Sequence, residues 1–233
     1  TFSIPALVER DGRAAAWRRI LTRSAVIFLL GIFYYGGLSK PLAEVRILGV
    51  LQRIAICYFA TSVLFLYLRP RALAAVLVAL LLGYWAAMAL VPVPGVGAGS
   101  WEMGRNLANY LDSVALPGRK WDVTWDPEGL LSTVPAIGTC LLGALAGLAA
   151  KDPGTSDGRK VLRFLVAGAA LAALGWGWSA WVPVVKKIWT PSYVLVAGGY
   201  SLILLGLFWL VVEVWRLRTW ATPLVWIGAN PLA

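Results

Sequence analysis

The feature that most constrains the fold is a series of long apolar stretches separated by short polar ones. A helix needs about 20 apolar residues to cross the hydrocarbon layer of a bilayer. Because lipid offers no hydrogen-bond partner to a free backbone, such a segment must be helical. Six stretches are long enough, and a seventh begins near the end of the sequence: residues 20–38, 50–68, 72–92, 129–150, 161–182, 193–215 and 219–233. We therefore predict an all-α polytopic transmembrane helix bundle, a single membrane domain with about six complete spans plus a truncated seventh.

The overall composition favours the same fold class. Hydrophobic residues make up 60% of the 233 residues and charged residues only 14%, whereas soluble domains average about 45–50% and 25%. The net charge of +10 would suggest a nucleic-acid partner in a soluble protein, but no long basic stripe is present. The basic residues lie mostly at the ends of apolar stretches, where they meet anionic membrane lipid. We predict lipid contact and no nucleic-acid binding.

The sequence contains no histidine. This excludes histidine-based triads, metal sites and acid–base catalysis from the 233 residues. The two cysteines, Cys57 and Cys140, lie within apolar stretches, and we interpret them as small buried side chains rather than as a disulfide or a metal site. No metal is expected. Because the chain starts at Thr1 and stops at Ala233 inside an apolar stretch, we expect it to be an internal fragment of a longer protein.

The distribution of basic residues predicts an orientation in the membrane. Thirteen of the 21 Lys and Arg residues lie in the segments 1–23, 69–71, 151–163 and 216–218. Cytoplasmic loops carry an excess of these residues. We therefore predict that this set faces the cytoplasm and that the long polar loop 93–128 lies on the non-cytoplasmic side, in a multi-pass protein of the bacterial inner (plasma) membrane.

Polar groups at membrane depth are costly unless paired, so they are the strongest indicators of a site. Gln52 and Arg53 open the second stretch, where Arg53 either extends to the interface or binds a buried anion. Asp126 and Glu128 precede the fourth stretch. With Pro127 between them they either cap a helix or place two carboxylates where one can act as a base or bind an amine or hydroxyl.

Two further clusters lie closer to the end of the chain. Lys186 and Lys187 either anchor the chain at the interface or complement a phosphate. Trp189 beside them either anchors the chain or stacks on a sugar. Asn230 and Pro231 lie within the seventh stretch, where a proline leaves backbone carbonyls without partners and usually marks a site or a packed kink.

These clusters fall within four sequence strings, which occur in the order GVLQRIAICYF, WDPEGLLSTVPAIGTCLLGALAG, VVKKIWTPSYVL and WIGANPLA. They resemble bacterial relatives of the heparan-α-glucosaminide N-acetyltransferase family. The resemblance implies an enzyme of about eleven spans that takes acetyl from acetyl-CoA, its co-substrate, on the cytoplasmic side and delivers it to an amino sugar or glycan on the other. It also implies a histidine in an outer loop that would precede Thr1.

The matching motifs imply a set of site residues. The catalytic residues would be Asp126, Glu128 and Asn230, and the residues that bind substrate or cofactor would be Gln52, Arg53, Lys187, Trp189, Ser192 and Tyr193. A carboxylate would orient the acceptor, a cation would hold phosphates or the oxyanion, and the amide of Asn230 would donate a hydrogen bond.

Other functions also fit the sequence. A sugar or small-molecule transporter or permease would equally use broken helices and polar residues near the midplane. A non-catalytic membrane scaffold is the third alternative. The sequence also leaves a homodimer open.

Overall fold

The computed structural model describes residues 4–37, 39–223 and 225. The described residues form seven α-helices and contain no β-strand, which confirms the predicted all-α bundle. The helices are α1 (Ile4–Tyr34), α2 (Val50–Tyr67), α3 (Pro70–Leu90), α4 (Leu107–Ala115), α5 (Thr133–Ala150), α6 (Asp157–Trp178) and α7 (Pro191–Trp209). Three short elements accompany them: the 3-10 turns η1 (Leu42–Glu44) and η3 (Thr219–Ala221), and the π-helical turn η2 (Leu210–Val214).

Five helices in the described part of the chain are long and apolar enough to cross a membrane: α2, α3, α5, α6, and α7 together with η2. The chain is therefore an integral membrane protein. Helix α1 covers most of the first predicted span but is not among the five, because its last 18 residues include Arg18, Arg19 and Arg23. Most of the predicted seventh span lies outside the described residues. How the spans divide the chain stays a prediction.

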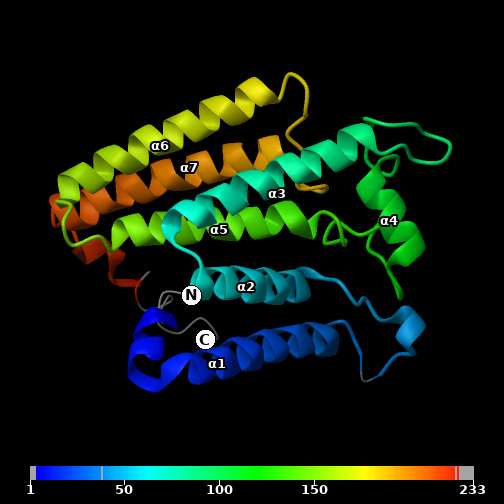
Figure 1. Ribbon diagram of the computed structural model, residues 1–233, viewed down its shortest axis with the longest axis horizontal. Coiled ribbons are helices and arrows are strands. Elements are labelled where there is room, and N and C mark those ends of the chain that lie inside the picture. Colours follow the sequence, from blue (N-terminus) through cyan, green and yellow to red (C-terminus); the bar gives the residue numbers. More distant parts are fainter. Residues whose placement is uncertain (1–3, 38, 224, 226–233) are drawn as a thin grey trace.

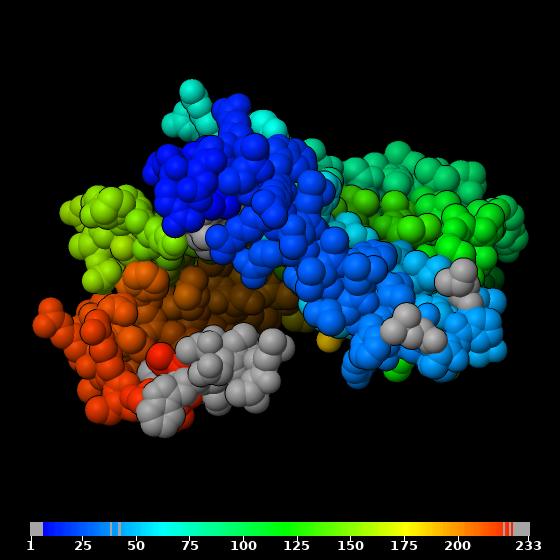
Figure 2. All heavy atoms as spheres, turned by 90° about the horizontal axis from the view of Figure 1, so that it is seen from below, coloured from blue at the N-terminus to red at the C-terminus, as the bar shows by residue number. Residues whose placement is uncertain are grey.

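The long helices lie roughly alongside one another (Figure 1). The main packed pairs are α6 with α7, α1 with α2, α3 with α5, and α2 with α5. Helix α4 lies at one end of the bundle, together with the connections 35–49, 91–132 and 179–190; we call this the loop end (Figure 1). Seen from the side of α1, helix α7 lies further back and the surface between them is hollowed (Figure 2).

Glycines let α6 and α7 approach almost backbone to backbone. A Cβ added at Gly168 of α6 would lie 2.7 Å from the carbonyl oxygen of Gly199 on α7, and one added at Gly175 would lie 2.8 Å from the backbone nitrogen of Val196. Small residues at such contacts are the usual means of packing helices in lipid.

We therefore expect Gly168→Ala to lower stability by about 1–3 kcal/mol, the usual cost of overpacking a tight contact. The matched control is Gly177→Ala on the same helix, where an added Cβ meets no atom within 4 Å. That change should be neutral or slightly stabilising, because alanine is the better helix former. Thermal unfolding in detergent measures both, and equal midpoints for the two variants would contradict the close approach.

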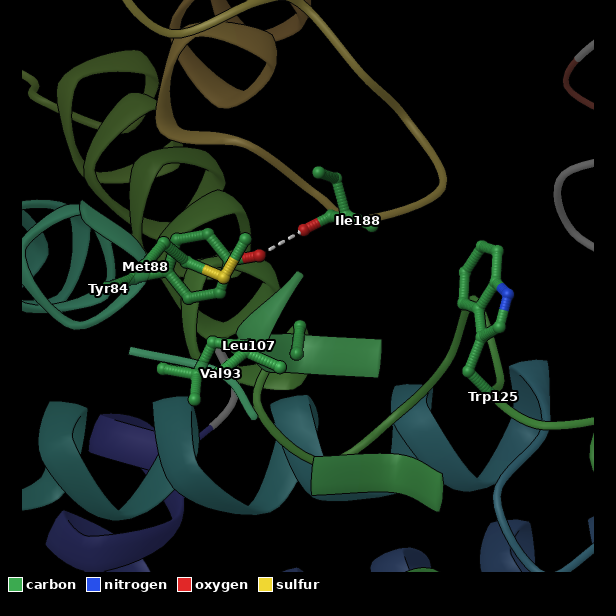
Figure 3. Close-up of a cluster of buried hydrophobic side chains, with 7 residues drawn as sticks. Tyr84, Met88, Val93, Leu107, Trp125 and Ile188 are labelled. Carbon is green, nitrogen blue, oxygen red and sulfur yellow. Dashed lines mark hydrogen bonds between the residues drawn. The ribbon is translucent and has the colours of Figure 1, made fainter. Parts of the chain in front are cut away.

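A buried apolar cluster fixes the loop end. It joins Tyr84 and Met88 of α3 to Leu107 of α4, Trp125 and Ile188. The hydroxyl of Tyr84 donates a hydrogen bond of 2.6 Å to the carbonyl of Ile188, and Figure 3 shows Met88 beside the ring. This hydrogen bond holds the connection 179–190 against α3 and thereby fixes the position of Trp189, the residue after Ile188.

Candidate functional site

The centre of the loop end is the side chain of Arg46, which is only 6% exposed. Its Nε and Nη2 donate to the two oxygens of Asp126 at 2.7 and 2.5 Å, which is the paired geometry that makes arginine–carboxylate contacts strong. Nη2 also contacts the carboxylate of Glu128, and Nη1 donates to the hydroxyl of Tyr35 at 3.0 Å. One guanidinium therefore joins the connection before α2 to the segment before α5.

Aromatic rings enclose this guanidinium. Its central carbon lies 5.1 Å from the ring centres of both Tyr35 and Trp121. Burial acts against the charged form, but the hydrogen bonds and charge of Asp126 and the charge of Glu128 outweigh it and raise the pKa of Arg46. Arg46 therefore stays charged at every accessible pH.

Each carboxylate oxygen of Asp126 accepts two hydrogen bonds from neighbouring groups of the protein. Its side chain is fully buried. Besides Arg46 it accepts hydrogen bonds from the backbone N–H groups of Trp121 and Glu128, each at 3.0 Å. With both oxygens occupied in this way, the geometry suits Asp126 to positioning Arg46 and the Glu128 backbone.

A second buried carboxylate, Asp112 of α4, binds the backbone of the segment that contains Asp126 and Glu128. It accepts hydrogen bonds from the backbone N–H of Leu130 at 2.8 Å and of Asp126 at 3.3 Å. Gly129 lies so close that an added Cβ would overlap the Asp112 carboxylate. Burial raises the pKa of Asp112 to about 6, against the opposing effect of its backbone hydrogen bonds.

This raised pKa predicts a pH dependence. Because the folded pKa of Asp112 lies above the value of about 3.9 in an unfolded chain, the folded state binds the proton more tightly. The resulting stabilisation is complete below pH ~4 and is lost as the pH rises through about 6. We expect the free energy of unfolding to fall by about 2–3 kcal/mol over this range in the wild type, relative to Asp112→Asn. Denaturant titrations in detergent test this, with Glu102→Gln on the exposed loop as the control that should follow the wild type.

Arg53 on α2 is the second buried cation, at 5% exposure. Its Nη2 donates to the carbonyl of Pro127 at 2.6 Å and contacts the hydroxyl of Ser132. The guanidinium carbon lies 4.8 Å from the ring centre of Trp189. Its Nε and Nη1 have no hydrogen-bond partner within the described part of the chain.

Trp189 is held in an unusual backbone conformation. Its φ of 52° lies in the left-handed region, which costs a residue with a Cβ about 1–2 kcal/mol. The indole Nε1 donates to the hydroxyl of Thr139 at 3.0 Å, and the ring meets that of Tyr193 edge to face at 5.3 Å. Strain of this kind persists only where the surroundings enforce it, and it concentrates at functional sites.

Two cavities meet beside these residues. The apolar cavity, of about 500 Å³, is lined by α2, α5, Glu128 and Trp189. The cationic cavity, of about 410 Å³, has these lining residues: Tyr35, Arg46, Val50, Trp121, Pro127, Glu128, Lys186, Lys187 and Trp189. Val50, Glu128 and Trp189 belong to both linings. The Glu128 side chain is 17% exposed, so it is a carboxylate that a ligand in either cavity can reach.

The structure brings four of the predicted site residues to these cavities: Arg53, Glu128, Lys187 and Trp189. Lys187 forms an ion pair of 2.9 Å with Asp122.

The other predicted residues within the described part of the chain line neither cavity. Tyr193 supports Trp189. Gln52 is fully buried beside Gly31 of α1, and its Oε1 accepts from the backbone N–H of Gly49 at 3.2 Å. Ser192 is also fully buried and donates to the carbonyl of Pro183 at 3.0 Å. Asn230 lies outside the described residues.

Sequence reasoning missed Arg46 and Asp112. Neither lies in a long apolar stretch, and each has its partners far along the chain. Within the part of the chain that the structure describes, no group of three His, Cys, Asp or Glu side chains could hold a metal ion. Cys57 and Cys140 are free thiols, and both line the apolar cavity; Cys57 is buried as predicted, whereas Cys140 is exposed, so the prediction of a buried side chain is wrong there.

Comparison with known proteins supplies the family context. No family model matches the chain. Human heparan-alpha-glucosaminide N-acetyltransferase is 27% identical to it over 93% of the chain, and the mouse protein is 24% identical over 92%. The chain spans about 40% of the length of these curated relatives. The four sequence strings and these two similarities agree: the chain is a distant relative of the heparan-alpha-glucosaminide N-acetyltransferases.

Proposed function

We propose that this chain forms the acceptor-binding part of a membrane-bound acetyltransferase. The enzyme would move an acetyl group from acetyl-CoA to the amine of an amino sugar or glycan on the non-cytoplasmic side of a bacterial inner membrane. The observation that carries this proposal is the meeting of two cavities at Glu128 and Trp189, in a chain whose two curated relatives are named as N-acetyltransferases.

The chemistry requires an amine to attack the carbonyl carbon of a thioester. A C–N bond forms, the C–S bond breaks, coenzyme A leaves as its thiol, and the amine gives up a proton to a base. Glu128 would accept a hydrogen bond from the acceptor amine and hold its lone pair towards the thioester. Arg46 fixes the Glu128 carboxylate, and Asp126 in turn fixes Arg46. In this proposal the base is the histidine that the family resemblance implies before Thr1.

The ring faces and cations suit a sugar acceptor. Trp121 and Trp189 both line the cationic cavity, and aromatic rings at a polar rim can stack on a sugar. Lys187 would bind an anionic group of the acceptor, and Asn230 would donate through its amide.

The test is to incubate membranes containing the full-length protein with acetyl-CoA labelled in the acetyl group, together with glucosamine-type acceptors. We expect label on the acceptor amine, and loss of that label in the Glu128→Gln variant but not in Glu102→Gln. Uptake of unmodified sugar into vesicles, with no label transferred, would overturn the acetyltransferase and favour a transporter instead.

A further inference from the structure

An unsatisfied cation lines the apolar cavity. Two donor atoms of the Arg53 guanidinium, Nε and Nη1, have no hydrogen-bond partner among the described residues. The residue is only 5% exposed, so bulk water does not replace the missing partners. Burying charged donors without acceptors carries a large free-energy cost. A guanidinium left in this state on a cavity wall indicates a ligand that brings anionic oxygen atoms to it, and both phosphate and carboxylate match its planar set of donors.

The rest of the apolar cavity has the chemistry of a hydrocarbon site. Its lining includes Ile54, Ala136, Gly143 and Ala144. Its lining follows α2 over the twelve residues from Val50 to Thr61, and their ends are about 16 Å apart along the helix axis. An occupant of matching shape is a flexible chain that lies parallel to α2 and α5.

The cationic cavity adjoins this site at the end where Arg53 lies. Lys186 and Lys187 line it. Lys187 is paired with Asp122, whereas no ion pair involving Lys186 occurs within the described residues. A molecule with a hydrocarbon tail in the apolar cavity would therefore place its head group between Arg53 and the two lysines. The charge of this region is complementary to a phosphate.

We infer that the acceptor is a lipid-linked sugar. Its hydrocarbon tail occupies the apolar cavity, its phosphate binds Arg53 with Lys186 and Lys187, and its sugar extends into the cationic cavity towards Glu128. The sugar and its acetylation rest on the proposed function, whereas the binding of a lipid phosphate can be tested without it.

The probe is farnesyl phosphate, a phosphate joined to an isoprenoid chain, titrated onto the purified full-length protein in detergent. We expect it to bind at least tenfold more tightly than either farnesol or inorganic phosphate, because only the complete molecule fills both parts of the site. Equal affinity of farnesol and farnesyl phosphate would overturn the phosphate site, and failure of farnesyl phosphate to bind would overturn the whole inference.

Matched variants locate the binding site. Gly143→Leu projects a side chain into open space on the lining of the apolar cavity, since an added Cβ there meets no atom within 4 Å. We expect it to weaken farnesyl phosphate binding at least tenfold with an unchanged melting temperature. Gly83→Leu on α3, also at a position where an added Cβ meets no atom within 4 Å but which lines neither of the two cavities, should bind like the wild type. Arg53→Gln should likewise lose at least tenfold, and equal binding by all four proteins would refute the site.

Two competition experiments separate this occupant from others. Acetyl-CoA should not displace farnesyl phosphate, because donor and acceptor must be bound together for transfer; displacement would assign the cavity to the donor and overturn the inference. Phosphatidylglycerol should compete at least tenfold less well, and equal competition would make the occupant an ordinary membrane lipid. If farnesyl phosphate binds as expected while no acetyl transfer is detected, the lipid-phosphate site stands and the proposed function falls.

Discussion

Replacing Arg46 with glutamine is expected to destabilise the protein by about 3–5 kcal/mol, the usual cost of removing one partner from a buried ion pair. The change leaves the fully buried Asp126 carboxylate without its cation and removes the contact with Glu128. It also disconnects the segment before α2 from the segment before α5. Denaturant or thermal unfolding in detergent measures the loss.

An exposed arginine in the same part of the chain provides the control. Arg105 is 61% exposed and lies 3.7 Å from Glu102, so Arg105→Gln should change stability by less than about 1 kcal/mol. The double variant Arg46→Gln/Asp126→Asn should recover part of the stability lost by Arg46→Gln, because the unpaired charge is then gone. A loss no greater than that of Arg105→Gln would show that the Arg46 cluster does not hold the loop end together.

Glu128→Gln is expected to lower acetyl transfer by about 10²-fold, the order of loss that follows when a reacting group is misplaced by about 1 Å. Glutamine keeps the length of the side chain and an oxygen that can accept from Arg46, but it is uncharged and holds the acceptor amine more weakly than the carboxylate does. Because Asp126 still pairs with Arg46 in this variant, the melting temperature should change little. The measurement is kcat for acetyl transfer in membranes, normalised to the amount of folded protein.

Glu44→Gln is the matched control for this loss, since Glu44 lies on the connection between α1 and α2 and lines neither of the two cavities. Its activity should equal that of the wild type. Transfer by Glu128→Gln at the wild-type rate would remove Glu128 from the proposed mechanism.

The fold class could be predicted from the sequence because lipid imposes a simple rule. Apolar stretches of about 20 residues must become helices, and the resulting bundle is observed. The rule works less well at α1, which runs from Ile4 to Tyr34 with a kink at Gly12 and contains Arg18, Arg19 and Arg23. A count of apolar residues detects the second half of such a helix and gives no information about the first.

The site was predictable only in part, because its centre is a contact between distant segments. Asp126 and Glu128 stood out as acidic residues at the edge of an apolar stretch. Their partner Arg46 lies 80 residues before Asp126, in a polar connection. A single arginine there has the sequence pattern of an ordinary interfacial residue. Gln52 and Ser192 were also predicted as site residues, yet the Oε1 of Gln52 and the hydroxyl of Ser192 bond within the fold; the Nε2 of Gln52 has no partner among the described residues. A sequence pattern identifies costly polar groups but does not show which have already found partners.

The separation of Arg46 from its carboxylates has a consequence for biosynthesis. The ribosome produces Arg46 long before Asp126, with α2, α3 and α4 made in between. The loop end can therefore close only after the segment that contains Asp126 has been made, which comes later than α4.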